Sequence, residues 1–267
     1  MTALATMLLA AATSTLGDPG AIPATARPPI LQQVNFEQRL DQPLPLDLRF
    51  RDESGTSIRL GDLFHGRPVV LTLAYYRCPM LCPMVLNGTV RAMNALPLEL
   101  GRDYDVVTVS FDPEDDAAAA AAKREEYRGH YNGRGGDFSW RFLTGGADSI
   151  RGLTEAVGFR SVHDPSRNQF AHAAAILVVT PQGRISRYFY GIEYSARDLR
   201  LGLVEASQGK IGSIADQLLL FCFHYDPSTG RYSSVALGLV RMGGVLTVVG
   251  LVAFVAVLRR RENERHA

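Results

Sequence analysis

The strongest constraint on the fold is a regular alternation of apolar runs with segments of helical periodicity. The run at 68–76 is almost wholly apolar, which is typical of a strand buried on both faces of a sheet. Residues 79–96 follow with apolar side chains at helical spacing. The pattern then continues, with strands expected at 105–111 and 138–143 and helices expected at 117–130 and 149–157.

The last part of this pattern predicts a hairpin and a closing helix. Two apolar runs at 171–180 and 184–190 flank Pro181-Gln182-Gly183, a sequence typical of a tight turn. A helix is expected at 195–207. We therefore predict an α/β sandwich of about 160 residues, assigned to residues 47–208 and preceded by a linker at 27–46.

The first residues of the chain resemble a secretory signal. Residues 4–15 are short, apolar and rich in small side chains, and Ala24-Thr25-Ala26 offers a cleavage site. The run is too short to cross a bilayer. We predict a signal peptide at 1–26, although no Lys or Arg precedes its apolar run.

A longer apolar run near the other end predicts a membrane anchor. Residues 235–258 contain a single charge, Arg241, one turn from the near end, where a long side chain can reach the interface. Arginines are frequent in the tail at 259–267, which the positive-inside rule assigns to the cytoplasm. Residues 209–234 become a juxtamembrane linker, and the domain is expected on the outer face of a bacterial inner membrane, toward the periplasm or cell exterior.

Composition excludes several classes of protein. The 28 basic and 27 acidic residues give a net charge of +1, so no electrostatic surface for nucleic acid is expected. Three cysteines among 267 residues are too few for a disulfide framework.

Two of those cysteines, Cys78 and Cys82, are the chemical centre of the sequence. They lie where the first buried strand passes into a helix, and an i, i+4 spacing puts them on one face of its first turn. Free N–H groups at a helix start favour thiolates, and a pair of thiolates makes a soft anionic site that suits Cu(I). Flanking prolines suggest an exposed rigid turn. A structural disulfide and two small buried apolar residues are the alternative interpretations.

Copper in its divalent state needs a third ligand, typically an imidazole. His65, His130 and His163 lie in polar or loop-like surroundings and His266 lies in the tail. His172 differs because it opens an otherwise apolar strand. A histidine there can equally be a hydrogen-bonded core residue.

Three segments together resemble the SCO/SenC family. They are YYRCPMLCP with Cys78 and Cys82, VTVSFDPED with Asp112 and Pro113, and FAHAAAILVVTPQGRI with His172. The resemblance runs from about residue 34 to 225 and implies a thioredoxin-like fold with a central mixed sheet. It also implies that Cys78, Cys82 and His172 bind one copper ion.

The family resemblance implies a copper metallochaperone that assists assembly of the copper centres of cytochrome c oxidase. The expected partners are the copper-bearing oxidase subunit and another periplasmic copper chaperone. Two departures stand out: the anchor is C-terminal rather than N-terminal, and the acidic residue often found close to the histidine is missing.

Two enzymatic alternatives remain beside the metallochaperone. As a thiol–disulfide oxidoreductase, the protein would use Cys78 and Cys82 as a redox pair acting on cysteines of an oxidase subunit. A peroxidase is less well supported. Its cysteine would need activating residues nearby, and only Arg77 and the adjacent tyrosines are available. Cys222 and His224, close to the membrane segment, could hold a second copper ion or form an aromatic interfacial segment.

Overall fold

The computed structural model describes residues 34–134 and 138–211, together with the isolated residues 225, 226, 231, 232, 242, 244 and 247. Its strands are β1 Asn35–Phe36, β2 Arg49–Arg51, β3 Ser57–Arg59, β4 Val69–Ala74, β5 Asp105–Ser110, β6 Trp140–Leu143, β7 Phe159–Asp164, β8 Gln169–His172, β9 Ala175–Val179, β10 Ile185–Tyr190, β11 Tyr225–Asp226 and β12 Arg231–Tyr232. Its helices are the 3-10 helix η1 Leu60–Leu63 and the α-helices α2 Leu81–Asn94, α3 Ala117–His130, α4 Ala147–Ala156 and α5 Ala196–Ser207.

A five-stranded mixed sheet in the order β10-β9-β4-β5-β6 forms the centre of the fold. Strands β4, β5 and β6 run parallel, whereas β9 is antiparallel to both β4 and β10. Every residue of β4, β5 and β9 is buried, as their continuous apolar sequences predict. The expected mixed α/β sheet is therefore confirmed.

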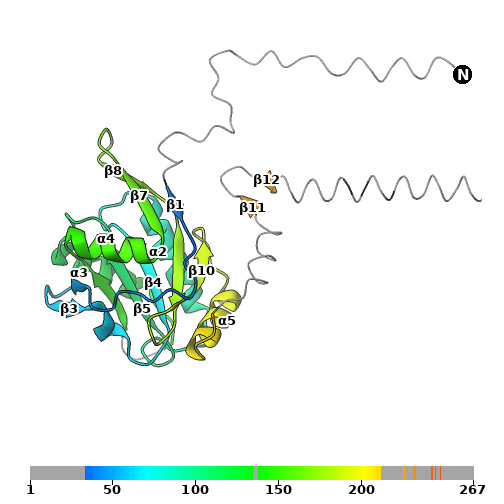
Figure 1. Cartoon of the computed structure of the whole chain (residues 1–267). Helices are drawn as coiled ribbons and strands as arrows, with labels where there is room; N and C mark the ends of the chain where they lie inside the picture. The colour runs from blue at the N-terminus through cyan, green and yellow to red at the C-terminus, as the bar shows by residue number, and fades with distance from the viewer. Residues whose placement is uncertain are drawn as a thin grey trace, which may run out of the picture.

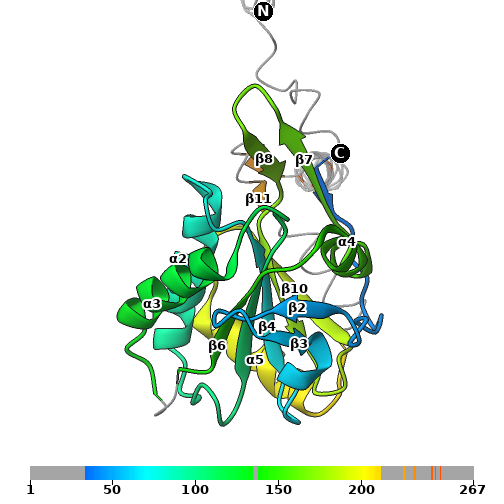
Figure 2. The ribbon, with the colours of Figure 1, turned by 90° about the vertical axis from the view of Figure 1, so that its left-hand side faces the viewer.

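Helices cover this sheet and account for its burial. In Figure 2, α2 and α3 lie on one side of the strands and α4 on the other. Helix α2 approaches the segment after β10 closely, since a Cβ at Gly88 would lie 1.9 Å from the carbonyl oxygen of Ile192. Only glycine allows this approach, which fixes α2 and the cysteine-bearing turn before it.

A second, three-stranded sheet in the order β1-β7-β8 projects from the body. Figure 1 shows the β7–β8 hairpin extending beyond the end of the central sheet. Strand β1 belongs to the segment 27–46, which was expected to be a linker. Over its described residues this segment packs on the domain, because Phe36 and Leu44 are buried and Asn35 pairs with Arg160.

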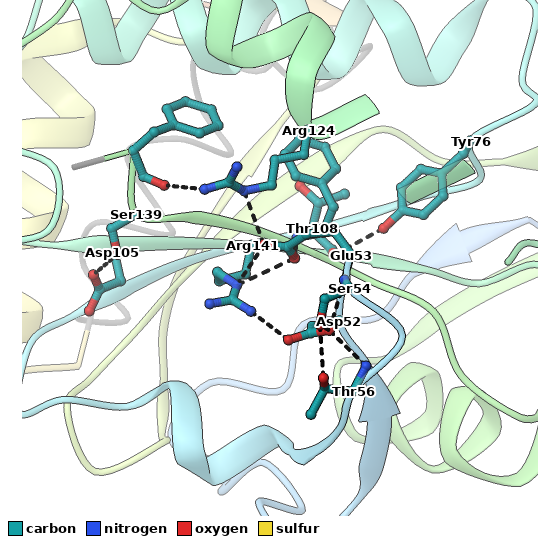
Figure 3. Close-up of polar contacts among 12 residues, drawn as sticks. Asp52, Glu53, Ser54, Thr56, Tyr76, Asp105, Thr108, Arg124, Ser139 and Arg141 are labelled. Atoms are coloured by element: carbon teal, nitrogen blue, oxygen red, sulfur yellow. Dashed lines mark hydrogen bonds and ion pairs between the residues drawn. The ribbon is translucent and has the colours of Figure 1, made fainter. Parts of the chain in front are cut away.

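A polar network fastens the β2–β3 hairpin to the central sheet (Figure 3). Arg141 on β6 donates to Asp52 over 2.8 Å and lies 3.0 Å from a Glu53 carboxylate oxygen, which also pairs with Arg124 on α3. Asp52 is buried and accepts further bonds from Ser54. Burial opposes a lower pKa at Asp52, but the Ser54 and other hydrogen bonds, with Arg141, hold it below its usual value.

The expected element at 171–180 is divided in two. Residues 169–172 form β8 in the projecting sheet, whereas 175–179 form β9 in the central sheet. His172 therefore ends a strand instead of opening one. The small, half-buried residues Ala173 and Ala174 connect the two strands, and their apolar character made a single continuous strand the simpler prediction.

No helix among the described residues has the length and apolar character needed to cross a membrane. The predicted span at 235–258 lies outside those residues apart from 242, 244 and 247. The predicted signal peptide at 1–26 and tail at 259–267 also lie outside them, as does most of the linker at 209–234.

Candidate metal and thiol site

The two cysteines lie at the carboxyl end of β4, where the chain turns into α2. Cys78 precedes the helix, and Cys82 is its second residue. Both are buried, with exposed fractions of 9% and 2%, and no disulfide joins them. The prediction of an exposed turn was wrong for the thiols, although Arg77 and Pro79 beside Cys78 are exposed.

Hydrogen bonds to the two sulfurs differ, and so do their acidities. The N–H of Cys82 donates to Cys78 Sγ over 3.3 Å, and the N–H of Tyr75 donates to Cys82 Sγ over 3.4 Å. Hydrogen bonding from the Cys82 thiol is the largest cause that lowers the pKa of Cys78 to about 3, against the opposing effect of burial. Burial and the adjacent Cys78 thiolate raise the pKa of Cys82. The shifts favour the thiolate at Cys78 and the thiol at Cys82, whereas the position at the helix start favours thiolates at both.

His172 completes a compact group of three donors. Its Nε2 lies 3.3 Å from Cys82 Sγ, and its Nδ1 lies 3.0 Å from the carbonyl oxygen of Ala173. That carbonyl can only accept, so Nδ1 donates this bond and Nε2 is the ring nitrogen that faces the Cys82 sulfur. One ligand atom from each of Cys78, Cys82 and His172 lies within 4.8 Å of the others.

Sheet topology explains why residues so distant in sequence meet. Strand β9 is antiparallel to β4, and Thr72 near the end of β4 pairs with Ile176 near the start of β9. The chain entering β9 therefore passes the turn that leaves β4. His172 ends β8 only three residues before β9 begins, so the projecting hairpin delivers the imidazole to the cysteines.

Aromatic side chains enclose the imidazole. The ring centroids of Phe111, Tyr75 and Phe159 lie 5.1, 6.1 and 6.1 Å from that of His172. Phe170 packs against both Tyr75 and Phe111. Burial and hydrogen bonding to Cys78 raise the pKa of Tyr75, so its hydroxyl stays protonated beside that sulfur. The enclosure limits water at the donors and holds the imidazole in place.

Comparison with known proteins identifies the family. The sequence model described as SCO1/SenC matches residues 38–201, more than half of the chain. The chain belongs to the SCO1/SenC family. No relative was found among curated proteins.

Two solved structures from one organism support the fold. A proposed electron transfer protein from Aquifex aeolicus VF5 is 25% identical over 64% of this chain and 96% of its own, with a TM-score of 0.56. A proposed electron transport protein from the same organism is 23% identical over 64% of this chain and 100% of its own, with a TM-score of 0.53. Arabidopsis thaliana ScoI, solved with copper bound, is 16% identical over 64% of this chain and 99% of its own, with a TM-score of 0.49.

A buried carboxylate, which the sequence did not single out, fastens the cysteine turn of this SCO1/SenC chain. Asp115 accepts from the N–H of Tyr76 over 2.7 Å and from the Ser110 hydroxyl over 2.6 Å. Its other oxygen lies 3.6 Å from Arg77 Nε. Burial raises the pKa of Asp115, and the bonds from Ser110 and Tyr76 oppose that rise. Asp115 lies in the FDPED motif, so an acidic residue after the second buried strand was the available signal.

Tyr76 anchors the same turn from its side-chain end. Its hydroxyl donates to the carbonyl oxygen of Leu143 over 2.7 Å. The same hydroxyl lies 3.3 Å from the carbonyl oxygen of Thr108 (Figure 3). The turn that carries Cys78 is therefore fixed through both the main chain and the side chain of Tyr76. Asp112 lies outside the donor group and accepts from the N–H of Glu114 within its own loop.

The remaining histidines of the described residues lie apart from the donors. His65 is half exposed and 3.4 Å from Asp105. His163 is exposed and contacts Asn168 within the β7–β8 hairpin, and His130 is also exposed. These positions agree with the expectation of surface residues. Cys222, His224 and His266 lie outside the described residues.

Proposed function

We propose that this protein is a membrane-anchored copper metallochaperone that assists assembly of the copper centres of cytochrome c oxidase. The observation that carries the proposal is the convergence of Cys78, Cys82 and His172 donor atoms within 4.8 Å. Thiolate sulfur selects soft ions such as Cu(I), and imidazole also serves Cu(II). Membership of the SCO1/SenC family supports both the metal and the oxidase partner.

The site's own residues suit a metal that must be held and then released. Ligands bind an ion at about 2.0–2.3 Å, so donors spaced by up to 4.8 Å need only small side-chain adjustments. Cys78 can bind the ion as the thiolate that its lowered pKa favours. Cys82 must first lose its thiol proton, so metal binding releases a proton there. The bond from His172 Nδ1 to Ala173 orients the imidazole, as outer hydrogen bonds do for ligating histidines. Three donors leave a position through which a partner's ligand can enter.

Copper titration of the full-length chain under anaerobic conditions tests the proposal. The His172→Ala variant should lose more than about a hundredfold in Cu(II) affinity, because losing a ligand exceeds the 10–100-fold effect of an outer-shell partner. Its Cu(I) affinity should change less, since both cysteines remain. The control is His163→Ala, an exposed histidine in the same hairpin. Unchanged Cu(II) affinity and spectrum in His172→Ala would remove the imidazole from the site.

A thiol–disulfide oxidoreductase is the second candidate, favoured by the lowered pKa of Cys78. The Cys78 thiolate would attack a protein disulfide and release one partner thiolate. Cys82, after losing its proton, would then attack Cys78 Sγ and release the second. The partner gains two electrons and this protein becomes the disulfide. Rapid reduction of an oxidase-subunit disulfide, unchanged in His172→Ala and without tight copper binding, would favour this candidate.

The proposed location is the outer face of a bacterial inner membrane, with one C-terminal span at 235–258. The apolar length of that segment and the arginines after it support this orientation. The proposed partners are the copper-bearing oxidase subunit and a periplasmic copper donor. An extracytoplasmic position would put the donor group on the side where such partners deliver and receive the ion.

A further inference from the structure

Two exposed methionines lie next to the cysteines in the sequence, Met80 between Cys78 and Cys82 and Met84 two residues after Cys82. Met80 is 69% exposed, more than any other large apolar side chain among the described residues, and Met84 is 42% exposed. The third methionine of the domain, Met93, lies in the same helix and is fully buried. Single exposed apolar side chains are ordinary, but these two carry thioether sulfurs beside a pair of thiols, so they add soft donors to the surface of that turn.

The main chain brings these methionines close to each other and to Cys78. Met80 is the N-cap of α2, and the N–H of Met84 donates to the carbonyl oxygen of Met80 over 3.3 Å. This main-chain bond closes the first turn of α2 and holds the backbones of the two methionines one turn apart. The N–H of Met80 also donates to the Cys78 sulfur. Two exposed thioether side chains therefore branch from the same short main-chain segment that carries the Cys78 thiol.

The buried donors need such a route. Cys78, Cys82 and His172 are 9%, 2% and 8% exposed, so an arriving ion meets the surface around them first. Thioether sulfur is a soft, neutral ligand that selects Cu(I) and binds it without losing a proton. The positive charge beside the cysteines, Arg77, is held by other groups. It donates to the carbonyl oxygen of Glu114 and pairs with the Asp115 carboxylate.

We propose that Met80 and Met84 form an outer Cu(I) site that receives the ion and passes it to Cys78. This inference rests on the proposed copper function and adds a separate site to it. The transfer is ligand exchange: the bond from Cu(I) to the Cys78 thiolate forms as the thioether bonds break. The ion stays Cu(I), so no electron moves and no oxidant is needed. The outer site sets the rate of loading, and the buried site sets the final affinity.

The test is stopped-flow loading of the full-length chain with Cu(I) presented by a coloured Cu(I) chelator. The double variant Met80→Leu/Met84→Leu keeps the apolar bulk but removes both sulfurs. It should load about tenfold more slowly, while its equilibrium Cu(I) affinity stays within about twofold of wild type. The matched control is Met93→Leu, the same exchange at a buried position of α2, which should load at the wild-type rate.

The outcomes separate this inference from the proposed function. If the double variant loads as fast as wild type, the outer site is disproved while copper binding stands. If wild type itself takes no Cu(I) from the chelator, the copper function fails. If Met93→Leu slows loading as much as the double variant does, the effect comes from the helix and the outer site is again disproved.

Discussion

At the scale of single residues, the different hydrogen bonds and burial of the two cysteines shift their pKa values in opposite directions. Cys78 receives hydrogen bonds from the Cys82 thiol and the main chain, which lower its pKa to about 3 although burial opposes the shift. Cys82 is buried beside that negative charge, and its pKa is raised. These opposite shifts favour a thiolate at Cys78 and a thiol at Cys82, whereas helix position alone favours thiolates at both positions.

Alkylation by a small reagent measures this difference. In the folded metal-free protein, the rate at Cys78 should stay nearly constant from about pH 5 to 8, because the thiolate is fully formed throughout. In denaturant the alkylation rate of the same cysteine should rise about tenfold for each unit of increasing pH, as long as the pH stays below the ordinary pKa of a cysteine. Mass spectrometry of the labelled peptide separates Cys78 from Cys82, which should stay unmodified while folded. A rate at Cys78 that climbs with pH in the folded protein would contradict the assignment.

Asp115 is expected to act as a positioning residue for the cysteine turn. Asp115→Ala leaves the buried N–H of Tyr76 without its acceptor, and an unsatisfied buried group costs roughly 1–3 kcal/mol. Asp115→Asn keeps an oxygen that can accept the same bond, so its loss should be smaller. Urea unfolding gives the free energies, and copper titration of both variants reports the geometry of the turn. Equal stability of Asp115→Ala and wild type would show that the bond does not hold the turn.

At the scale of elements, the close approach of α2 to the segment after β10 makes a clear prediction. Gly88→Ala would place a Cβ 1.9 Å from the Ile192 carbonyl oxygen, and overpacking of this kind costs roughly 1–3 kcal/mol. Gly129→Ala in α3 is the matched control, because its Cβ would meet nothing within 4 Å. That change should stabilise the protein by about 0.5–1 kcal/mol through helix propensity. Thermal unfolding of both variants measures the contrast, and a stabilised Gly88→Ala would refute the close approach.

Elements were predictable from the sequence where their burial is uniform. Strands β4 and β5 lie within the predicted ranges, and α3 matches its range of 117–130, because apolar runs and an Ala-rich stretch each favour one conformation. Strand β7 was missed because its sequence FRSVHD is half exposed and polar. The prediction also missed β8, and this is why His172 was misplaced. The alanines around His172 were assigned to the strand that is now β9, although His172 belongs to β8. The proximity of His172 to the cysteines is a product of sheet order, which local sequence does not encode.

Residues that surround the donors were predictable only in part. The cysteines carry a local motif, but Tyr75, Phe111 and Phe159 reach the imidazole from three different strand ends. In the sequence these aromatic residues indicate only that they pack in the core. Their proximity to His172 follows from the order of the strands in the sheets. Asp115 is similar, since its partners Tyr76 and Ser110 come from two neighbouring strand ends.

At the scale of the whole molecule, the proposed function requires the copper donors to lie on the outer face of the membrane. The proposed orientation rests on the arginines in the tail at 259–267 and on the apolar run before them. A chain truncated after residue 234 should therefore leave the membrane fraction and still bind copper. A chain truncated after 258 keeps the span and serves as the control, which should remain in the membrane fraction.

Orientation itself is measured with reporters fused to the C-terminus of the full-length chain. A reporter active only outside the cytoplasm should be inactive there, and one that fluoresces only in the cytoplasm should be bright, because three arginines at 259–261 resist translocation. The same outward-active reporter fused after residue 211, where the described domain ends, should be active. The opposite pattern at the two positions would put the donors in the cytoplasm, away from an extracytoplasmic oxidase partner, and would contradict the proposed place of copper delivery.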